Sequence, residues 1–272
     1  MKDTILFGDC RETLKEFDEK ARCCVTSPPY YGLRDYGGED SQIGQEQSPE
    51  EYIEEMVNVF RLVRDCLTDD GTLWLNIGDS YYNYRKDGCI PKQTFSANRQ
   101  DLPVTTPRRS NKLKGYKEKD LIGIPWMLAF ALRADGWYLR QDIIWHKPNP
   151  MPESVRDRCT KSHEYIFLLS KNKNYYYDND AIKEPAKDWG TRDRSNGKYH
   201  NEGSGLTPHS GLTKSYSKRN KRSVWSINKK PYKGAHFATY PEELITPCIK
   251  AGSDKGDIIL VSYTHLTLPT KA

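Results

Sequence analysis

The chain has 272 residues and a formal net charge of +5; 36% of its residues are hydrophobic and 11% are aromatic, including eighteen tyrosines. This length suffices for one large core, the aromatic content excludes a disordered chain, and no segment approaches the roughly 20 apolar residues of a membrane span. The seven cysteines are odd in number and lack CxxC or Cys/His metal spacing. We therefore expect a reduced, cytoplasmic, globular protein without disulfides or a metal site.

The first predicted element in chain order is a strand at 21–26, an apolar run that ends where two prolines forbid further ladder bonding. A helix is predicted at 49–67. Its start combines an N-cap serine, a proline at the first helical position and a glutamate three residues after the cap. Apolar residues then recur at helical spacing until Gly71 breaks the chain.

A buried strand is predicted at 72–77, ended by Gly78 and Asp79. An apolar helix at 125–134 and strands at 138–146 and 164–170 follow. In the C-terminal part, the pattern predicts a last helix from Pro241 to Ala251, stopped by Gly252, and a strand from Asp257 to Val261.

Alternating strands and helices predict an α/β fold with a largely parallel sheet. In such sheets the ligand lies beyond the carboxyl ends of the strands. Two polar segments follow predicted strands, Ser27 to Tyr30 after the first and Gly78 to Asp79 after the second. We expect both to lie at the binding edge.

Basic residues gather in two stretches. Residues 85–119 hold ten Lys/Arg against three Asp/Glu, and residues 183–233 hold thirteen against four, so the remainder of the chain is acidic. Basic loops on an acidic body suit binding to a phosphate backbone. A pair of solvated loops explains the charge equally well, and both interpretations stay open at this point. The second stretch is predicted to be a long loop or a small excursion from the core.

The segment Ser27-Pro28-Pro29-Tyr30 carries the most chemistry. Two prolines lack N–H groups and have fixed φ, so they form a stiff turn whose carbonyls are expected to be free acceptors. A hydroxyl before them and an aromatic ring after them complete a polar slot with a stacking wall. Such a slot can orient an exocyclic base amine, although an arbitrary tetrapeptide of this kind is more often a rigid turn.

The neighbouring sequence resembles the beta-type amino-methyltransferases of DNA. Gly8-Asp9-Cys10 stands about twenty residues upstream of the proline turn, followed by Leu14, as in that family. Further similar segments come in the family's order: 70–79 (DGTLWLNIGD), 142–149 (DIIWHKPN), 163–167 (HEYIF) and 236–244 (HFATYPEEL). The resemblance implies a Rossmann-like, S-adenosylmethionine-dependent methyltransferase sheet with a circularly permuted motif order.

The resemblance also implies roles for individual residues. The catalytic loop would be Ser27, Pro28, Pro29 and Tyr30; Ser27 and the Pro28 carbonyl would hold the amine, and Tyr30 would stack on a flipped base. Contacts with S-adenosylmethionine are expected from Asp9, Cys10, Thr26, Phe237, Ala238 and Thr239. Contacts with double-stranded DNA are expected from Arg34, Lys147, Arg108, Arg109, Arg219 and Arg222. Outside the family context, the simpler alternatives are a turn-capping aspartate at Asp9, a helix-entry loop at Phe237 to Thr239 and a satisfied core histidine at His146.

A serine at the first position of the loop favours cytosine N4 over adenine N6 within this family. The expected activity is therefore site-specific cytosine-N4 methylation of duplex DNA in a prokaryote or phage, with adenine-N6 methylation as the alternative. A restriction endonuclease is a possible partner. RNA or another amine as the substrate, and a DNA-binding module without catalysis, are the remaining alternatives.

The resemblance ends near residue 260. There the family continues with an acidic residue, Pro-Phe and a glycine-rich turn, whereas residues 261–272 contain no glycine. We expect a methyltransferase domain at 1–260, incomplete at its C-terminus and carrying two basic target-recognition insertions. The tail at 261–272 is expected to be unrelated to the family and poorly packed, with weak or absent methyl transfer as the result.

Overall fold

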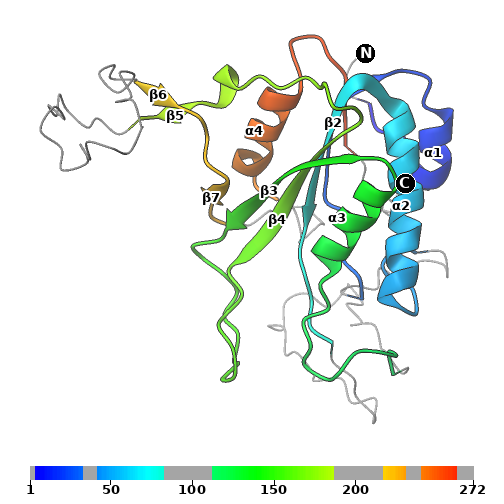
Figure 1. The fold of residues 1–272 in the computed structure, drawn as a ribbon, viewed down its shortest axis with the longest axis vertical. Helices are drawn as coiled ribbons and strands as arrows, with labels where there is room; N and C mark the ends of the chain where they lie inside the picture. The colour runs from blue at the N-terminus through cyan, green and yellow to red at the C-terminus, as the bar shows by residue number, and fades with distance from the viewer. Residues whose placement is uncertain (1–3, 33–41, 83–111, 187–216, 231–239, 262–272) are drawn as a thin grey trace, which may run out of the picture.

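The computed structural model describes residues 4–32, 42–82, 112–186, 217–230 and 240–261. Its centre is a six-stranded sheet in the order β7-β3-β4-β2-β1-β8 (Figure 1). The bounds of these strands are, in the same order, Val224–Ser226, Tyr138–His146, His163–Ser170, Leu67–Ile77, Ala21–Thr26 and Ile259–Leu260. A separate two-stranded ribbon joins β5 (Glu184–Pro185) to β6 (Lys218–Arg219).

Helices cover both faces of the sheet (Figure 1). One face packs against α1 (Cys10–Glu16), α2 (Pro49–Cys66) and α3 (Ile124–Ala134). The other packs against α4 (Glu242–Gly252), beside the short 3-10 helix η1 (Asp180–Ile182). Alternate side chains of β2 pack into the two cores, because successive residues of a strand point to opposite faces. Leu73 and Leu75 face α2, and Trp74 faces α4. The result is a three-layer α/β domain.

One strand runs against the others. β4 is antiparallel to both of its neighbours, β2 and β3, whereas β1 is parallel to β2 and β8, and β3 is parallel to β7. The sheet is therefore largely parallel, as expected, with β4 as the exception. The reversal brings the first residues of β4 to the edge where the neighbouring strands end, since Trp145 pairs with Glu164 and Ile77 with Tyr165.

Most predicted elements are confirmed within one or two residues. β1 and β3 have the predicted bounds, and α2 begins at Pro49 with the Ser48 side chain accepting from the Glu51 amide, as the capping pattern requires. β2 begins five residues earlier than predicted, at Leu67, which pairs with Ala21; an irregularity separates this pair from the regular pairing that starts at Cys23 and Thr72. The predicted strand 257–261 is shortened to β8.

Some elements were missed by the sequence pattern. α1 has only seven residues, and two of them, Cys10 and Leu14, are buried. The second basic stretch is more than a loop, because its described part contains β5, β6 and β7, and β7 joins the main sheet as an edge strand beside β3. Three residues in a basic context are too few for a periodic signal. No helix in the described ranges combines the length and apolarity of a membrane span.

Candidate active site

The loop that follows β1 is held by a hydrogen bond from α2. Pro28 and Pro29 are buried, whereas Ser27 and Tyr30 are partly accessible. The Tyr52 hydroxyl of α2 donates a 2.6 Å hydrogen bond to the Pro29 carbonyl. The prediction that both proline carbonyls are free acceptors is therefore wrong for Pro29, because the buried carbonyl needs a partner. Burial raises the pKa of Tyr52 well above its ordinary value, so the hydroxyl remains a donor.

Tyr30 is a half-buried residue whose hydroxyl has a partner inside the protein. The hydroxyl donates to Glu164 Oε2 at 2.9 Å. Burial and the neighbouring Glu164 carboxylate raise the pKa of Tyr30 well above the ordinary tyrosine value. A residue that is not fully buried is compatible with stacking on a base, and this role of Tyr30 stays a prediction.

The Glu164 carboxylate contacts side chains from three neighbouring segments. Besides Tyr30, it accepts from Asn76 Nδ2 at 3.5 Å and forms an ion pair with Lys147, whose ammonium lies 4.2 Å from the centre of the Trp145 ring. The Asn76 amide also donates to the Tyr165 carbonyl at 3.1 Å. These groups join the ends of β2 and β3 and the start of β4 to the proline loop.

Gly78 and Asp79 lie directly beside this cluster, as predicted from their place after a parallel strand. A Cβ atom on Gly78 would lie 2.8 Å from Tyr30 Cε2 and 3.2 Å from Glu164 Cγ, so only glycine fits without movement. The Asp79 carboxylate accepts from the amides of Gly123 and Ile124 at 3.0 and 3.1 Å, and so satisfies the free N–H groups at the start of α3. Asp79 is thus a helix-capping residue.

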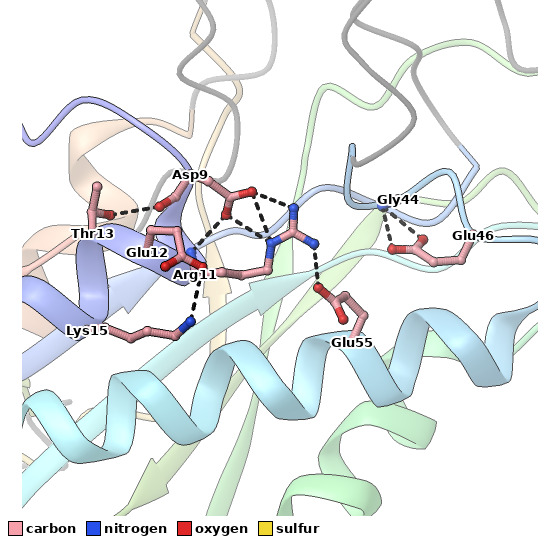
Figure 2. A network of polar contacts seen from close by, with 8 residues as sticks. All are labelled: Asp9, Arg11, Glu12, Thr13, Lys15, Gly44, Glu46 and Glu55. Atoms are coloured by element: carbon pink, nitrogen blue, oxygen red, sulfur yellow. Dashed lines mark hydrogen bonds and ion pairs between the residues drawn. The ribbon is translucent and has the colours of Figure 1, made fainter.

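Asp9 begins α1 as its N-cap (Figure 2). Its carboxylate accepts from the Arg11 amide at 2.8 Å and from the Arg11 guanidinium, which also contacts Glu55 Oε1 of α2 at 2.7 Å. The Arg11 hydrogen bonds lower the pKa of Asp9. Burial, with the Asp9 charge second, raises the pKa of the neighbouring Cys10 to about 11. The capping alternative for Asp9 is confirmed, and its contact with a cofactor stays a prediction.

The other predicted site residues lie in different parts of the molecule or outside its described residues. Thr26 is buried at the end of β1, opposite Leu75. Arg219 and Arg222 both donate to Glu184 Oε1, at 3.0 and 2.9 Å, on the β5–β6 side of the molecule. Six predicted positions lie outside the described residues, as does the tail at 262–272: Arg34, Arg108, Arg109, Phe237, Ala238 and Thr239.

Two further predicted residues have partners in the protein. Lys147, expected at DNA, is paired with Glu164, and its side chain is only 14% exposed. His146 is half-buried, with Nδ1 3.0 Å from the Ser226 hydroxyl. Within the described ranges, no three His, Cys, Asp or Glu side chains are grouped closely enough to hold a metal ion. The DNA contact of Lys147 remains a prediction.

Sequence analysis missed the roles of Tyr52, Asn76 and Glu164. Glu164 belongs to a segment that resembles the family, but nothing in the pattern assigned its carboxylate a partner. The available signal was the polar pair His163-Glu164 at the start of an otherwise apolar strand. It becomes informative only with the strand direction, because a parallel β4 would put Glu164 at the opposite edge.

Comparison with solved structures identifies the fold. The cytosine-N4-specific PvuII DNA methyltransferase aligns with a TM-score of 0.57 and 15% identity over 94% of this chain and 72% of that chain. TTHA0409 from Thermus thermophilus, a putative DNA modification methylase complexed with S-adenosyl-L-methionine, aligns with a TM-score of 0.50 and 21% identity, covering 93% and 76% of the two chains. The fold is the Rossmann-like α/β fold of methyltransferases.

Sequence comparison gives the family. The sequence model of the family described as DNA methylase, which covers N6 and N4 methyltransferases, matches residues 21–260. The chain therefore belongs to this family. The type II methyltransferase M.SmaI of Serratia marcescens is 48% identical over 94% of this chain and 77% of its own length. M.XycI of Xanthomonas campestris pv. cyanopsidis is 46% identical over 94% and 75%, respectively. The resemblance found in the motifs is confirmed.

Proposed function

We propose that the protein transfers a methyl group from S-adenosylmethionine to the N4 amine of cytosine at a short specific site in duplex DNA. The observation that carries this proposal is the Ser27 to Tyr30 loop, held at the carboxyl edge of the sheet in a DNA methylase. Its serine favours cytosine N4. The relatives named type II methyltransferases support an accompanying restriction endonuclease, which we include in the proposal.

The loop supplies acceptors and a stacking surface for a base turned out of the duplex. The Ser27 hydroxyl and the Pro28 carbonyl accept the two amine hydrogens and direct the nitrogen lone pair away from them. Pro29 stiffens the loop, because its own carbonyl is held by Tyr52. The Tyr30 ring stacks on the base. When bound, the cofactor would supply the methyl group: direct transfer would form the N–CH₃ bond as the C–S⁺ bond breaks, leaving a neutral thioether, and the amine would release one proton to solvent. No covalent enzyme intermediate and no cysteine would be required.

S-adenosylmethionine supplies a methyl group on a positively charged sulfur. Asp9 fits a role in holding this cofactor, because its carboxylate is 40% exposed and its lowered pKa keeps it charged. A charged carboxylate accepts hydrogen bonds from hydroxyl and amino groups. Cys10 and Thr26 and the segment from Phe237 to Thr239 complete the proposed cofactor contacts.

The two basic stretches form the proposed DNA-binding surface. Arg219 and Arg222 share one carboxylate, Glu184, and Arg222 is 69% exposed. Two guanidinium groups on one carboxylate leave an excess of positive charge, which favours a phosphate. Arg34, Arg108, Arg109 and Lys147 belong to the same proposal.

The test uses the chain with methyl-labelled S-adenosylmethionine and unmethylated duplex DNA, followed by digestion to nucleosides. Labelled N4-methylcytosine is the expected product, formed slowly if the tail at 261–272 weakens methyl transfer as its sequence predicts. Labelled N6-methyladenine would overturn the cytosine assignment, and label in RNA alone would overturn DNA as the substrate. Salt-dependent DNA binding with neither cofactor binding nor label would indicate a DNA-binding fragment without catalysis.

A further inference from the structure

One carboxylate connects three segments of the candidate site, the proline loop, the end of β2 and the residue after β3. Glu164 Oε2 accepts from the Tyr30 hydroxyl and the Asn76 amide, and Glu164 Oε1 pairs with the Lys147 ammonium. Its side chain is 17% exposed. A carboxylate in such surroundings is costly unless both oxygens are occupied, and here both are.

The contact with Tyr30 is specific to the tyrosine hydroxyl. A ring used for stacking alone could be phenylalanine, which needs no buried partner. Here the hydroxyl donates to a charged acceptor, and hydrogen bonds of this type are about twice as strong as neutral ones. The absence of a side chain on Gly78 lets the Tyr30 ring and the Glu164 chain approach each other over the end of β2. The ring is therefore held at its far end as well as by its backbone.

Lys147 forms an ion pair with the second oxygen of the Glu164 carboxylate, Oε1. Its ammonium pairs with Glu164 and lies 4.2 Å from the centre of the Trp145 ring, and Trp145 Nε1 donates to the Ile227 carbonyl at 2.9 Å. A negative group on β4 and a positive group following β3 thus form a pair whose geometry depends on the sheet. Such an arrangement keeps Glu164 in one orientation.

We propose that Glu164 is a positioning residue for methyl transfer: through the Tyr30 hydroxyl it sets the orientation of the ring that contacts the flipped base, and Lys147 holds Glu164 in place. The inference rests on the proposed function, because it assigns Tyr30 to the base. Glu164 acts through Tyr30 and touches neither base nor cofactor. The ring is oriented before DNA binds, which reduces the cost of ordering it in the reactive complex.

The test compares wild type, Glu164→Gln, Tyr30→Phe and the double variant. Glutamine keeps the shape but replaces one acceptor oxygen by an NH₂ group, so it cannot accept from both Lys147 and Tyr30. We expect kcat to fall about 10- to 100-fold in each single variant, with KM for S-adenosylmethionine nearly unchanged. The double variant should lose no more than the worse single variant, because both changes remove the same contact.

A matched control separates positioning from general stability. Asp135 is also a shielded carboxylate, 11% exposed, that holds two cations, Arg61 and Arg64. It follows the last residue of α3, about 16 Å along the helix from the end that Asp79 caps. Asp135→Asn should lower the unfolding temperature and leave kcat within about twofold of wild type.

The outcomes distinguish the two proposals. If the wild type is active, either of two results overturns the positioning role. One is a kcat of Glu164→Gln within twofold of wild type. The other is a double variant in which the kcat losses of the two single variants multiply. A wild type that forms no methylated nucleoside overturns the proposed function. In that case the same four proteins are unfolded in urea, and additive effects on the free energy of unfolding overturn the Tyr30–Glu164 contact as well.

Discussion

Replacing Gly78 by alanine should damage the active site through a single methyl group. The added Cβ would lie 2.8 Å from Tyr30 Cε2 and 3.2 Å from Glu164 Cγ, whereas carbon atoms in contact prefer about 3.5 to 4.0 Å. Gly78 has no positive φ, so the alanine backbone is not strained. The Tyr30 ring must instead move by about 0.7 Å or more. Overpacking of this kind costs about 1–3 kcal/mol, and a catalytic group misplaced by about 1 Å can cost roughly 100-fold in rate.

We therefore expect Gly78→Ala to lower kcat by about 10- to 100-fold, measured by label transfer to duplex DNA at saturating cofactor. Gly71→Ala is the matched control, because a Cβ there would also lie 2.9 Å from its nearest neighbours, Leu67 Cβ and the Thr68 carbonyl oxygen. Seven residues along the strand separate the two glycines by about 23 Å. Gly71→Ala should lose stability but keep its kcat. Equal kcat values for Gly78→Ala and wild type would refute the proposed contact between ring and strand end.

Three further predictions concern the groups around the site. Tyr52→Phe should lower the free energy of unfolding in urea by about 1–3 kcal/mol, because a buried proline carbonyl loses its donor; an unchanged midpoint would contradict the buried hydrogen bond. Iodoacetamide at about pH 8, followed by peptide mass mapping, should label exposed Cys159 well before Cys10, whose pKa is raised to about 11; faster labelling of Cys10 would contradict its burial. The Arg11 contact lowers the pKa of Asp9, so its stabilising contribution is present above the ordinary aspartate pKa and is lost as the pH falls through the lowered value. The difference in unfolding temperature between wild type and Asp9→Asn should therefore shrink between about pH 5 and pH 2, and a difference that grows on acidification would refute this sign.

Local signals predicted the frame of the fold. The apolar run before the two prolines gave β1 its bounds, and the serine-proline-glutamate capping pattern gave α2 its start, because in both places the chain chemistry itself stops or begins the element. α1 and β7 have seven and three residues, too few for periodicity to identify them. Such short elements are fixed by the core they cover.

The sequence predicted the parts of the candidate site that lie at the ends of strands. It missed the part that depends on the direction of a strand. Ser27 and Gly78 come together because β1 and β2 are parallel neighbours. The arrival of Glu164 at the same edge requires β4 to be reversed between β2 and β3. An antiparallel strand in this position brings the start of one segment beside the ends of two others, and so supplies a carboxylate that no parallel crossover would place there. The reversal therefore gives the proline loop its charged partner, and Glu164, whose segment resembles the family without assigning its carboxylate a partner, reaches the candidate site through topology.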